Sequence, residues 1–314
     1  MKVLVTGGAG FVGVHLVQLL LTQPHVTAVT VLDCYRHTAT PQAVPAGDRV
    51  QVVQGDLLDG DLLADLVTGC DVVFHLAAET FVDASIADDR RFVETNIGGT
   101  AMLLRALRQV GGRQLVHVST DEVFGESDGE PFTEQSPYRP RNPYAATKAG
   151  ADHLVRSYIV THGLDARIVH CGNLFGRWQY PEKLIPVTVS RLLRGEAARI
   201  YGSGHQSRTW LHVSDAAAGL LAALEHGHPG ESYLIAGDSE LTTLDMVRRI
   251  AELAGVPAQN VIRHVPDRPG HDHRYAIDTT KARRDLGWKP QREFDSALED
   301  TVHWLIDNDG WWQK

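Results

Sequence analysis

The strongest constraint on the fold is a regular alternation of strand-like and helix-like segments in the first half of the chain. Short apolar runs are expected to form strands at 2–7, 27–33, 50–57, 70–78 and 114–119. Between them, helices are expected at 11–23, 61–69 and 92–111. Strands that are apolar on both faces are typical of a parallel sheet covered by helices. The sequence therefore predicts an α/β fold, a Rossmann-type doubly wound parallel sheet with right-handed crossovers.

The second half departs from this rhythm after Gly172 and is expected to contain a smaller lobe. Aromatic, proline and basic residues gather just after this glycine, and turn-rich segments follow. A later helix and strand then look like a return to the sheet. We expect a nucleotide-binding domain and a discontinuous C-terminal α/β substrate lobe, with a cleft between them. The domain should comprise 1–172 with 210–237 returning to it, and the lobe 173–209 and 238–314.

Composition narrows the class of partner. The 314 residues carry a net charge of -9, which argues against nucleic acid or an anionic membrane as the main partner. Cys34, Cys70 and Cys171 have no metal-like spacing, and neither do the 16 histidines, so we predict no metal and reduced thiols. Without a long apolar run or a signal peptide, the chain is expected to be cytoplasmic.

A glycine-rich segment joins the first expected strand to the first expected helix. In "VTGGAGFVG", Gly8, Gly10 and Gly13 have the G-x-G-x-x-G spacing, and Gly7 precedes them. Glycine allows a positive φ and a close approach of the backbone to a pyrophosphate. The helix N-terminus adds N–H groups and a partial positive charge. Between a strand and a helix, this spacing predicts a dinucleotide site.

Asp33, at the end of the second expected strand, indicates which dinucleotide binds. An acid there can accept hydrogen bonds from both ribose hydroxyls and would repel a 2′-phosphate, which favours NAD over NADP. The alternative is that Asp33 only caps the strand end. Arg36 keeps NADP open as a ligand, and Asp56 either bonds the adenine amino group or begins the next helix.

Tyr144 and Lys148 are a candidate acid–base pair. They are four residues apart, so on a helix they share a face. An ammonium near the phenol stabilises the phenolate, which can then take a proton near neutral pH. Alone, such a pair is commonly found on a protein surface, but here it follows the glycine-rich loop and five expected strands.

Asp121 and Glu122 stand side by side where the strand at 114–119 ends. Adjacent acids after a strand are usually solvated loop residues. In a desolvated cleft, however, neighbouring carboxyl groups can split their pKa values, so that one is ionised while the other is protonated. Which of the two holds the proton stays open, because the pair titrates together.

These segments together resemble the extended short-chain dehydrogenase/reductase superfamily and, within it, the dTDP-glucose 4,6-dehydratases. The resemblance covers nearly the whole chain, and its motifs stand in the family's order. Examples are "GGAGFVG", "ETNIGGT", "HVSTDEVFGE", "NPYAATKAGADHLVRSY", "RPGHDHRYAID" and "LGWKP". Epimerases and decarboxylases of the superfamily generally lack the adjacent Asp-Glu after Ser-Thr.

The resemblance implies a hydro-lyase with tightly bound NAD. Carbon 4 of dTDP-glucose, or of another NDP-glucose, would be oxidised, water eliminated across carbons 5 and 6, and the hydride returned to carbon 6. Tyr144, supported by Lys148, would take the 4-hydroxyl proton, and Thr120 would bond the same oxygen. Glu122 would be the base at carbon 5, and Asp121 the acid at the 6-hydroxyl.

The resemblance also implies the binding residues. For the cofactor they are Gly7, Gly10, Phe11, Val12, Gly13, Asp33, Asp56, Leu57, Leu76, Ala77, Ala78, Thr95, Tyr144 and Lys148. For the substrate they are Thr80, Thr120, Asn173, Lys183, Leu184, Tyr201, Arg208, Arg268 and His271. The basic residues among these match phosphate oxygens, although each can instead form a surface ion pair. Tyr201 either stacks on the base or ribose or is a core residue.

The chain departs from the family pattern at Phe81, Ala84, Leu174 and Arg177. These changes leave the base (dTDP, UDP, CDP or GDP) and the sugar open, while the acid–base set is whole. One alternative is a 4-epimerase, decarboxylase or 5,6-dehydratase of the same fold. Another is a non-catalytic NAD-binding regulator, and the presence of the full acid–base set argues against it.

The segments 96–109 and 146–160 bear on the oligomeric state. They expose more apolar and small residues than one sheet face needs. In this superfamily such helices pair into a four-helix interface, so a homodimer is expected.

Overall fold

The computed structural model describes residues 1–36, 38–257 and 261–312. Its centre is a seven-stranded sheet in the order β10-β6-β5-β4-β1-β2-β3, in which every neighbouring pair is parallel. The strands are β1 (Lys2–Thr6), β2 (Ala28–Asp33), β3 (Val50–Gln54), β4 (Val72–His75), β5 (Gln114–Thr120), β6 (Asp165–Cys171) and β10 (Ser232–Ile235). This confirms the predicted Rossmann-type sheet.

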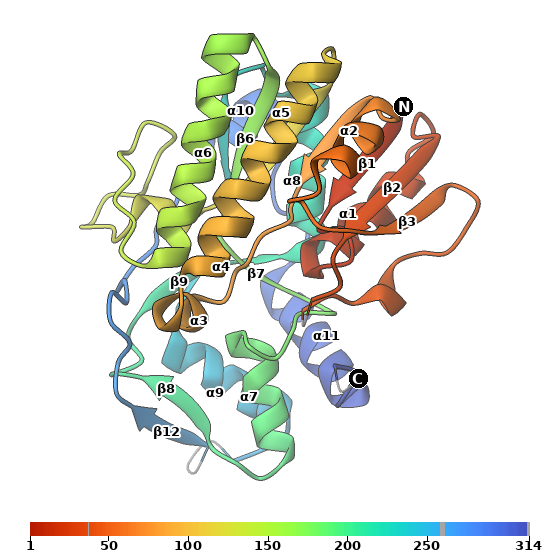
Figure 1. Ribbon diagram of the computed structural model, residues 1–314. Helices are drawn as coiled ribbons and strands as arrows, with labels where there is room; N and C mark the ends of the chain where they lie inside the picture. The colour runs from red at the N-terminus through yellow and green to blue at the C-terminus, as the bar shows by residue number, and fades with distance from the viewer. Residues whose placement is uncertain (37, 258–260, 313–314) are drawn as a thin grey trace.

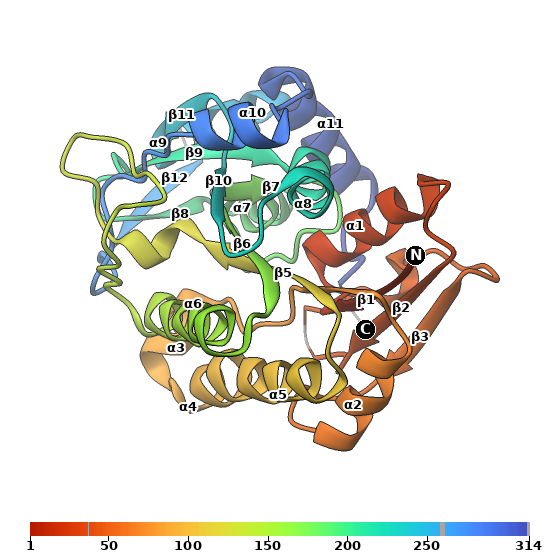
Figure 2. The same cartoon turned by 90° about the horizontal axis from the view of Figure 1, so that it is seen from above.

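Helices cover both faces of this sheet, as Figures 1 and 2 show. Alternate residues of one strand point to opposite faces, so Val3 and Val5 pack in one core and Leu4 in the other. The first core includes α1 (Phe11–Thr22), α8 (Val213–His226) and α10 (Thr280–Leu286). The second includes α2 (Gly60–Thr68), α5 (Thr100–Val110) and α6 (Pro143–His162). Both cores are apolar because the strands are apolar on both faces.

The predicted helix over 92–111 is present, but residues 93–99 are π-helical and not α-helical. The structure has α3 (Val82–Ala87), α4 (Arg90–Phe92) and a π-helical segment η2 (Val93–Gly99) before α5. The reason lies at Asn96, whose side chain accepts a hydrogen bond from the Glu79 backbone N–H (2.8 Å) and donates one to Thr147 (2.9 Å). These bonds hold the loop after β4 against α6. π-Helical turns of this kind are frequent at functional sites.

A smaller part of the molecule has its own sheets and core. Three strands pair in the order β11-β9-β7, and β8 pairs with β12. Their bounds are β7 (Asn173–Phe175), β8 (Ala198–Tyr201), β9 (Ser207–His212), β11 (Ser239–Thr242) and β12 (Ile262–Val265). The helices α7 (Leu184–Leu193), α9 (Thr243–Leu253) and α11 (Phe294–Asp307) pack around Phe175, Ile250 and Leu298. This part lies below the large sheet in Figure 1.

Two 3-10 turns complete the described structure. They are η1 (Pro41–Ala43) and η3 (Asp121–Phe124). Within the described ranges, no helix is both long enough and apolar enough to cross a membrane.

Candidate active site

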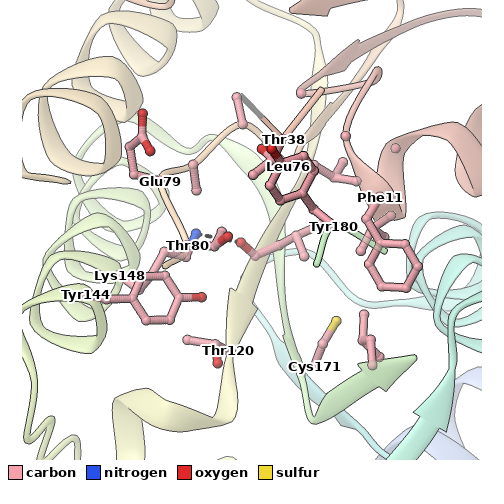
Figure 3. A pocket seen from close by; sticks show the side chains of 18 of the residues that line it. Phe11, Thr38, Leu76, Glu79, Thr80, Thr120, Tyr144, Lys148, Cys171 and Tyr180 are labelled. Carbon is pink, nitrogen blue, oxygen red and sulfur yellow. Dashed lines mark hydrogen bonds between the residues drawn. The ribbon is translucent and has the colours of Figure 1, made fainter. Parts of the chain in front are cut away.

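A pocket of about 360 Å³ opens at the carboxyl ends of the parallel strands. In an open α/β sheet this edge is where ligands bind. Residues that follow β1 to β6 line the pocket, and β7 and the loop after it close the other side. Figure 3 shows Tyr144 and Lys148 on one side of this space, and Phe11 and Cys171 on the other. All the residues predicted to bind the cofactor line it.

The glycine-rich turn is built by close contact between backbone segments. Gly7 has a φ of +68°, and a Cβ there would lie 2.7 Å from the backbone N and Cα of Ala77. A Cβ on Gly13 would lie 2.3 Å from the Gly7 carbonyl oxygen. Gly10 precedes α1, whose first turn has neither a side-chain cap nor an acidic residue. The first N–H groups of α1 are thus available to an anion, which suits a pyrophosphate.

Asp33 ends β2 beside this turn. Its carboxylate accepts hydrogen bonds from the Ala9 N–H (3.1 Å) and the Tyr35 N–H (2.9 Å). Each oxygen can accept more than one bond, so these contacts orient the carboxylate and leave it able to accept ribose hydroxyls. The cap at the strand end and the ribose contact are therefore compatible.

Arg36, which the sequence left as a possible partner for a 2′-phosphate, is paired with carboxylates. It donates to Asp56 (2.8 Å), Glu79 (2.9 Å) and Thr95 (3.3 Å). With Asp33 nearby, this end of the pocket holds three carboxylates and one guanidinium. That balance disfavours a further phosphate, and so favours NAD over NADP. The alternative that Asp56 begins the next helix is wrong, because Asp59 caps α2 by accepting from the Leu62 N–H.

Tyr144 and Lys148 are both buried on α6. The helix starts where Asn142 accepts from the Ala145 N–H, with Pro143 in the first position. Lys148 donates to the Val118 carbonyl (2.8 Å). Burial and the charge of Glu122 raise the pKa of Tyr144 well above its ordinary value, while a hydrogen bond with Thr120 acts in the opposite direction. The surface-pair alternative is therefore wrong, but the phenol needs further positive charge before it can act as a base near neutral pH.

The adjacent acids are held in the turn η3, and the solvated-loop alternative is wrong for Asp121. This residue is 2% exposed, and its Oδ2 has no hydrogen-bond partner among the described residues. Burial and the charge of Glu122 raise the pKa of Asp121 to about 7. Glu122 itself is half-buried and accepts from the Asn142 side chain (3.0 Å). A buried carboxyl with a raised pKa thus lies beside a second acidic residue that Asn142 orients.

Sequence reasoning missed several residues in this pocket and next to it. Asn142 joins Glu122 to the start of the tyrosine helix. An Asn before Pro-Tyr is a helix-start signal that would have found it. Cys171 ends β6, and the rule that ligands bind at the carboxyl ends of parallel strands would have placed it here. Other missed lining residues are Thr38, Glu79, Gln179, Tyr180, Glu182 and Trp210.

The predicted substrate residues divide into two groups. Thr80, Thr120, Asn173, Lys183 and Leu184 line the pocket, and Lys183 donates to the Thr80 carbonyl (2.8 Å). Tyr201, Arg208, Arg268 and His271 lie outside its lining.

Residues of this second group are engaged elsewhere. The buried Arg208 guanidinium donates to the Ser207 and Asp272 carbonyls and lies 4.1 Å from the Tyr275 ring centre. The contacts of Tyr201, Arg208, Arg268 and His271 with a nucleotide stay predictions. Within the part of the chain that the structure describes, no group of three or more His, Cys, Asp or Glu residues is arranged to hold a metal ion.

Comparison with known proteins places these features in a family. The family model for GDP-mannose 4,6 dehydratase matches residues 4–301. A dTDP-glucose 4,6-dehydratase of Streptomyces niveus is 44% identical over 100% of this chain and 95% of its own length. Another, of Mycolicibacterium smegmatis, is 41% identical over 100% of this chain and 96% of its own length.

Solved structures agree. DesIV of Streptomyces venezuelae, a dTDP-glucose 4,6-dehydratase with NAD and TYD bound, is 43% identical, with a TM-score of 0.96 over 100% of this chain and 99% of its own. A UDP-glucose 4-epimerase of Thermus thermophilus in complex with NAD is 31% identical, with a TM-score of 0.90 over 98% of this chain and 99% of its own. The fold is thus shared with epimerases, while the sequence identity to these dehydratases is higher. The chain belongs to the dTDP-glucose 4,6-dehydratase family of the extended short-chain dehydrogenase/reductase superfamily, as its motifs and its geometry both indicate.

Proposed function

We propose that this protein is an NAD-dependent dTDP-glucose 4,6-dehydratase that forms dTDP-4-keto-6-deoxyglucose. The main support is that Asp121 and Glu122 line the same pocket as Tyr144 and Lys148. Asp121 is also buried. A 4-epimerase needs the tyrosine and lysine but has no step that requires two further acids. The pair therefore favours elimination of water over epimerisation.

The cofactor half of the pocket suits NAD. Gly7, Gly10 and Gly13 leave the backbone bare where a pyrophosphate would lie, and Asp33 faces the ribose position. When bound, NAD supplies the acceptor for the carbon 4 hydride and returns that hydride to carbon 6. These contacts with NAD are proposals from the fit of the chain's own groups.

Tyr144, Thr120 and Lys148 would serve the oxidation at carbon 4. The Tyr144 phenolate takes the proton of the 4-hydroxyl, with Thr120 bonding the same oxygen and the Lys148 ammonium favouring the ionised phenol. The resulting ketone makes the hydrogen on carbon 5 acidic, because the carbanion is stabilised as an enolate. The oxidation thus prepares the elimination.

Asp121 and Glu122 would serve the elimination. Glu122 removes the proton from carbon 5, and Asp121 protonates the departing 6-hydroxyl as water. After the hydride has reached carbon 6, carbon 5 takes a proton back from Glu122, and the ketone at carbon 4 remains. The pKa of Asp121, raised to about 7, supports the acid role, because the carboxyl keeps its proton near neutral pH. Asn142 bonds Glu122 and holds its carboxylate at the edge of the pocket.

The smaller part of the molecule would be the sugar-nucleotide lobe. It lies mostly within the predicted segments 173–209 and 238–314 and has a core of its own, but β9 extends past residue 209 and α10 packs in the core of the large sheet. Lys183 and Asn173 reach the pocket from it. We expect Arg208 and Arg268 to act on the diphosphate, Tyr201 on the base or ribose, and His271 on a hydroxyl.

A homodimer is proposed through α5 and α6. These helices lie side by side on the outer face of the sheet in both cartoon views. Val160, in the last turns of α6, is 84% exposed, and an apolar side chain left in water favours a covered surface. Sedimentation at micromolar concentration tests this proposal, and a monomer would refute it.

The activity test compares dTDP-, UDP-, CDP- and GDP-glucose as substrates. We expect a 4-keto-6-deoxy product, seen by its absorbance in alkali, with dTDP-glucose as the best substrate. Mass spectrometry should find a product that is lighter by one water. A product of unchanged mass with inverted carbon 4 would replace the proposal with epimerisation.

A further inference from the structure

Asp83, in the short helix α3, forms contacts that cross between the two parts of the molecule. The Tyr201 hydroxyl donates a hydrogen bond of 2.7 Å to its Oδ2. The Arg268 Nη1 lies 3.5 Å from its Oδ1. Tyr201 ends β8, and Arg268 follows β12, so both partners belong to the smaller part. Figure 1 shows α3 between α6 and the helices of that part.

The Asp83 carboxylate is not fully paired. Its Oδ1 is buried and accepts no hydrogen bond from the described residues. The 3.5 Å separation from Arg268 is an ion-pair distance, longer than a charge-assisted hydrogen bond. A buried acceptor without a donor is unfavourable, so this oxygen favours a closer approach of the guanidinium. The bond to Tyr201 is already short, and therefore fixes the carboxylate.

The other side of α3 contacts the catalytic helix. Val82 packs in a small cluster with Phe92 and Tyr144. The Tyr144 N–H donates to the Ser85 hydroxyl (3.2 Å), which in turn donates to the Val82 carbonyl (2.6 Å). The six-residue helix α3 thus fixes the position of Asp83 relative to Tyr144.

We propose that Asp83 is a positioning residue for the nucleotide end of the substrate, acting through Tyr201 and Arg268. The inference rests on the proposed function, in which Tyr201 contacts the base or ribose and Arg268 contacts the diphosphate. Asp83 accepts the hydrogen bond of the Tyr201 hydroxyl and lies beside one edge of the Arg268 guanidinium. The ring of Tyr201 and the remaining Arg268 donors stay available to the base and the phosphates. The nucleotide is thereby placed relative to Tyr144.

The opposite role for Asp83 would be competition with the diphosphate for Arg268. The geometry argues against it, because the strong bond is to Tyr201 and the guanidinium is only loosely held. The two roles predict opposite signs. Removing a positioning residue weakens nucleotide binding, whereas removing a competitor strengthens it.

The experiment measures dTDP binding by calorimetry, and KM and kcat for dTDP-glucose, in Asp83→Ala and in the shape-conserving Asp83→Asn. We expect Asp83→Ala to weaken dTDP binding and to raise KM by roughly tenfold, as for one charged hydrogen bond, with kcat changed by less than about twofold. Asp83→Asn should lose less, since its oxygen can still accept from Tyr201. The matched control is Asp89→Asn, an exposed acid nearby without a side-chain cap bond.

A double-mutant cycle identifies the route of the effect. If Asp83 acts through Tyr201, then Asp83→Ala should weaken binding clearly less in a Tyr201→Phe background than in the unmutated protein. Unchanged or tighter dTDP binding in both Asp83 variants would overturn the inference, as would a full effect of Asp83→Ala in both the Tyr201→Phe and the Arg268→Ala backgrounds. An unmutated protein that binds dTDP but forms no keto product would refute the proposed function alone.

Discussion

The two ends of the cleft are built in different ways. At the cofactor end, the residues predicted from local motifs follow consecutive parallel strands, and all of them line one pocket. At the nucleotide end, Tyr201 bonds Asp83, His271 bonds Asp267, and Arg208 bonds backbone carbonyls. The residues of the first end were recognised from local motifs, whereas the second end includes contacts between distant segments, such as that of Tyr201 with Asp83. Substitutions should therefore act sharply at the first end and through partners at the second.

The largest effects are expected where the two ends meet, at the reacting centre. Tyr144→Phe removes the group that takes the 4-hydroxyl proton, so kcat should fall by about 100- to 10,000-fold without formation of reduced cofactor. Glu122→Gln should lower kcat similarly, but after oxidation, so reduced cofactor should accumulate when dTDP-glucose is added. Stopped-flow absorbance separates the two blocks.

Solvent deuterium gives the control for this pair. The Glu122→Gln protein should not exchange the carbon 5 hydrogen, whereas Asp121→Asn can still exchange it because the base is intact. Near-normal turnover of the sugar nucleotide by Glu122→Gln would mean that the dehydratase reading is wrong, since inversion at carbon 4 leaves the carbon 5 hydrogen in place.

The glycine turn tests how rigid the cofactor end is. In Gly13→Ala the new Cβ would lie 2.3 Å from the Gly7 carbonyl oxygen, and both are backbone-constrained. We expect a loss of about 3 kcal/mol in the free energy of unfolding and roughly a 100-fold loss in NAD affinity. Urea unfolding and NAD titration by fluorescence measure the two quantities.

Gly10→Ala is the matched control for Gly13→Ala. Its Cβ would meet only the Gly7 carbonyl oxygen, at 3.1 Å, within the protein. It should therefore weaken NAD binding with a smaller loss of stability. Equal loss of stability in the two variants would mean that the turn is sensitive to any side chain, and that the difference in packing does not matter.

Most of the fold could be predicted, because apolar strand segments and the glycines in the turns between elements are local signals. The parallel Rossmann-type sheet and the return of β10 to it were predicted from these signals. The π-helical segment could not be predicted, because it depends on Asn96 bonding Glu79 and Thr147, far from it in sequence.

The site divides in the same way. The acid pair and the tyrosine–lysine pair were found from their spacing. The pairing of Arg36 with Asp56 and Glu79, and the contact of Asp83 with Tyr201, join residues that no motif connects. Such contacts exist only once the chain has folded.

Asp33 provides a smaller test of the cofactor end. Asp33→Ala removes charge-assisted bonds to the ribose, each worth about 1.5–3 kcal/mol, so NAD should bind roughly 10- to 100-fold more weakly. The three carboxylates near Arg36 should make the unmutated protein prefer NAD to NADP. Calorimetry with NAD and with NADP measures this preference. Equal affinities for the two would mean that neither Asp33 nor the paired Arg36 selects against a 2′-phosphate.

The smallest effect concerns pH and the acid of the pair. Burial and Glu122 raise the pKa of Asp121 from 3.8 to about 7, so its protonated fraction falls as pH rises through about 7. If Asp121 is the acid, kcat should decline by roughly tenfold per pH unit above that value. The decline in kcat should be measured at saturating dTDP-glucose, so that it reports the ionisation of Asp121 in the enzyme–substrate complex.

The raised pKa of Asp121 also affects stability, and this effect distinguishes a catalytic role of Asp121 from a purely structural one. The folded state holds this proton more tightly than the unfolded chain, so the free energy of unfolding should fall as pH rises from about 4 to about 7. Asp121→Asn is neutral at every pH, and should lack both this fall and the alkaline decline in residual kcat. Urea unfolding at about pH 5 and about pH 8 measures the first, and a pH–rate profile the second. If the variant keeps the alkaline decline while losing the stability change, then Asp121 is a buried structural carboxyl and another group supplies the proton.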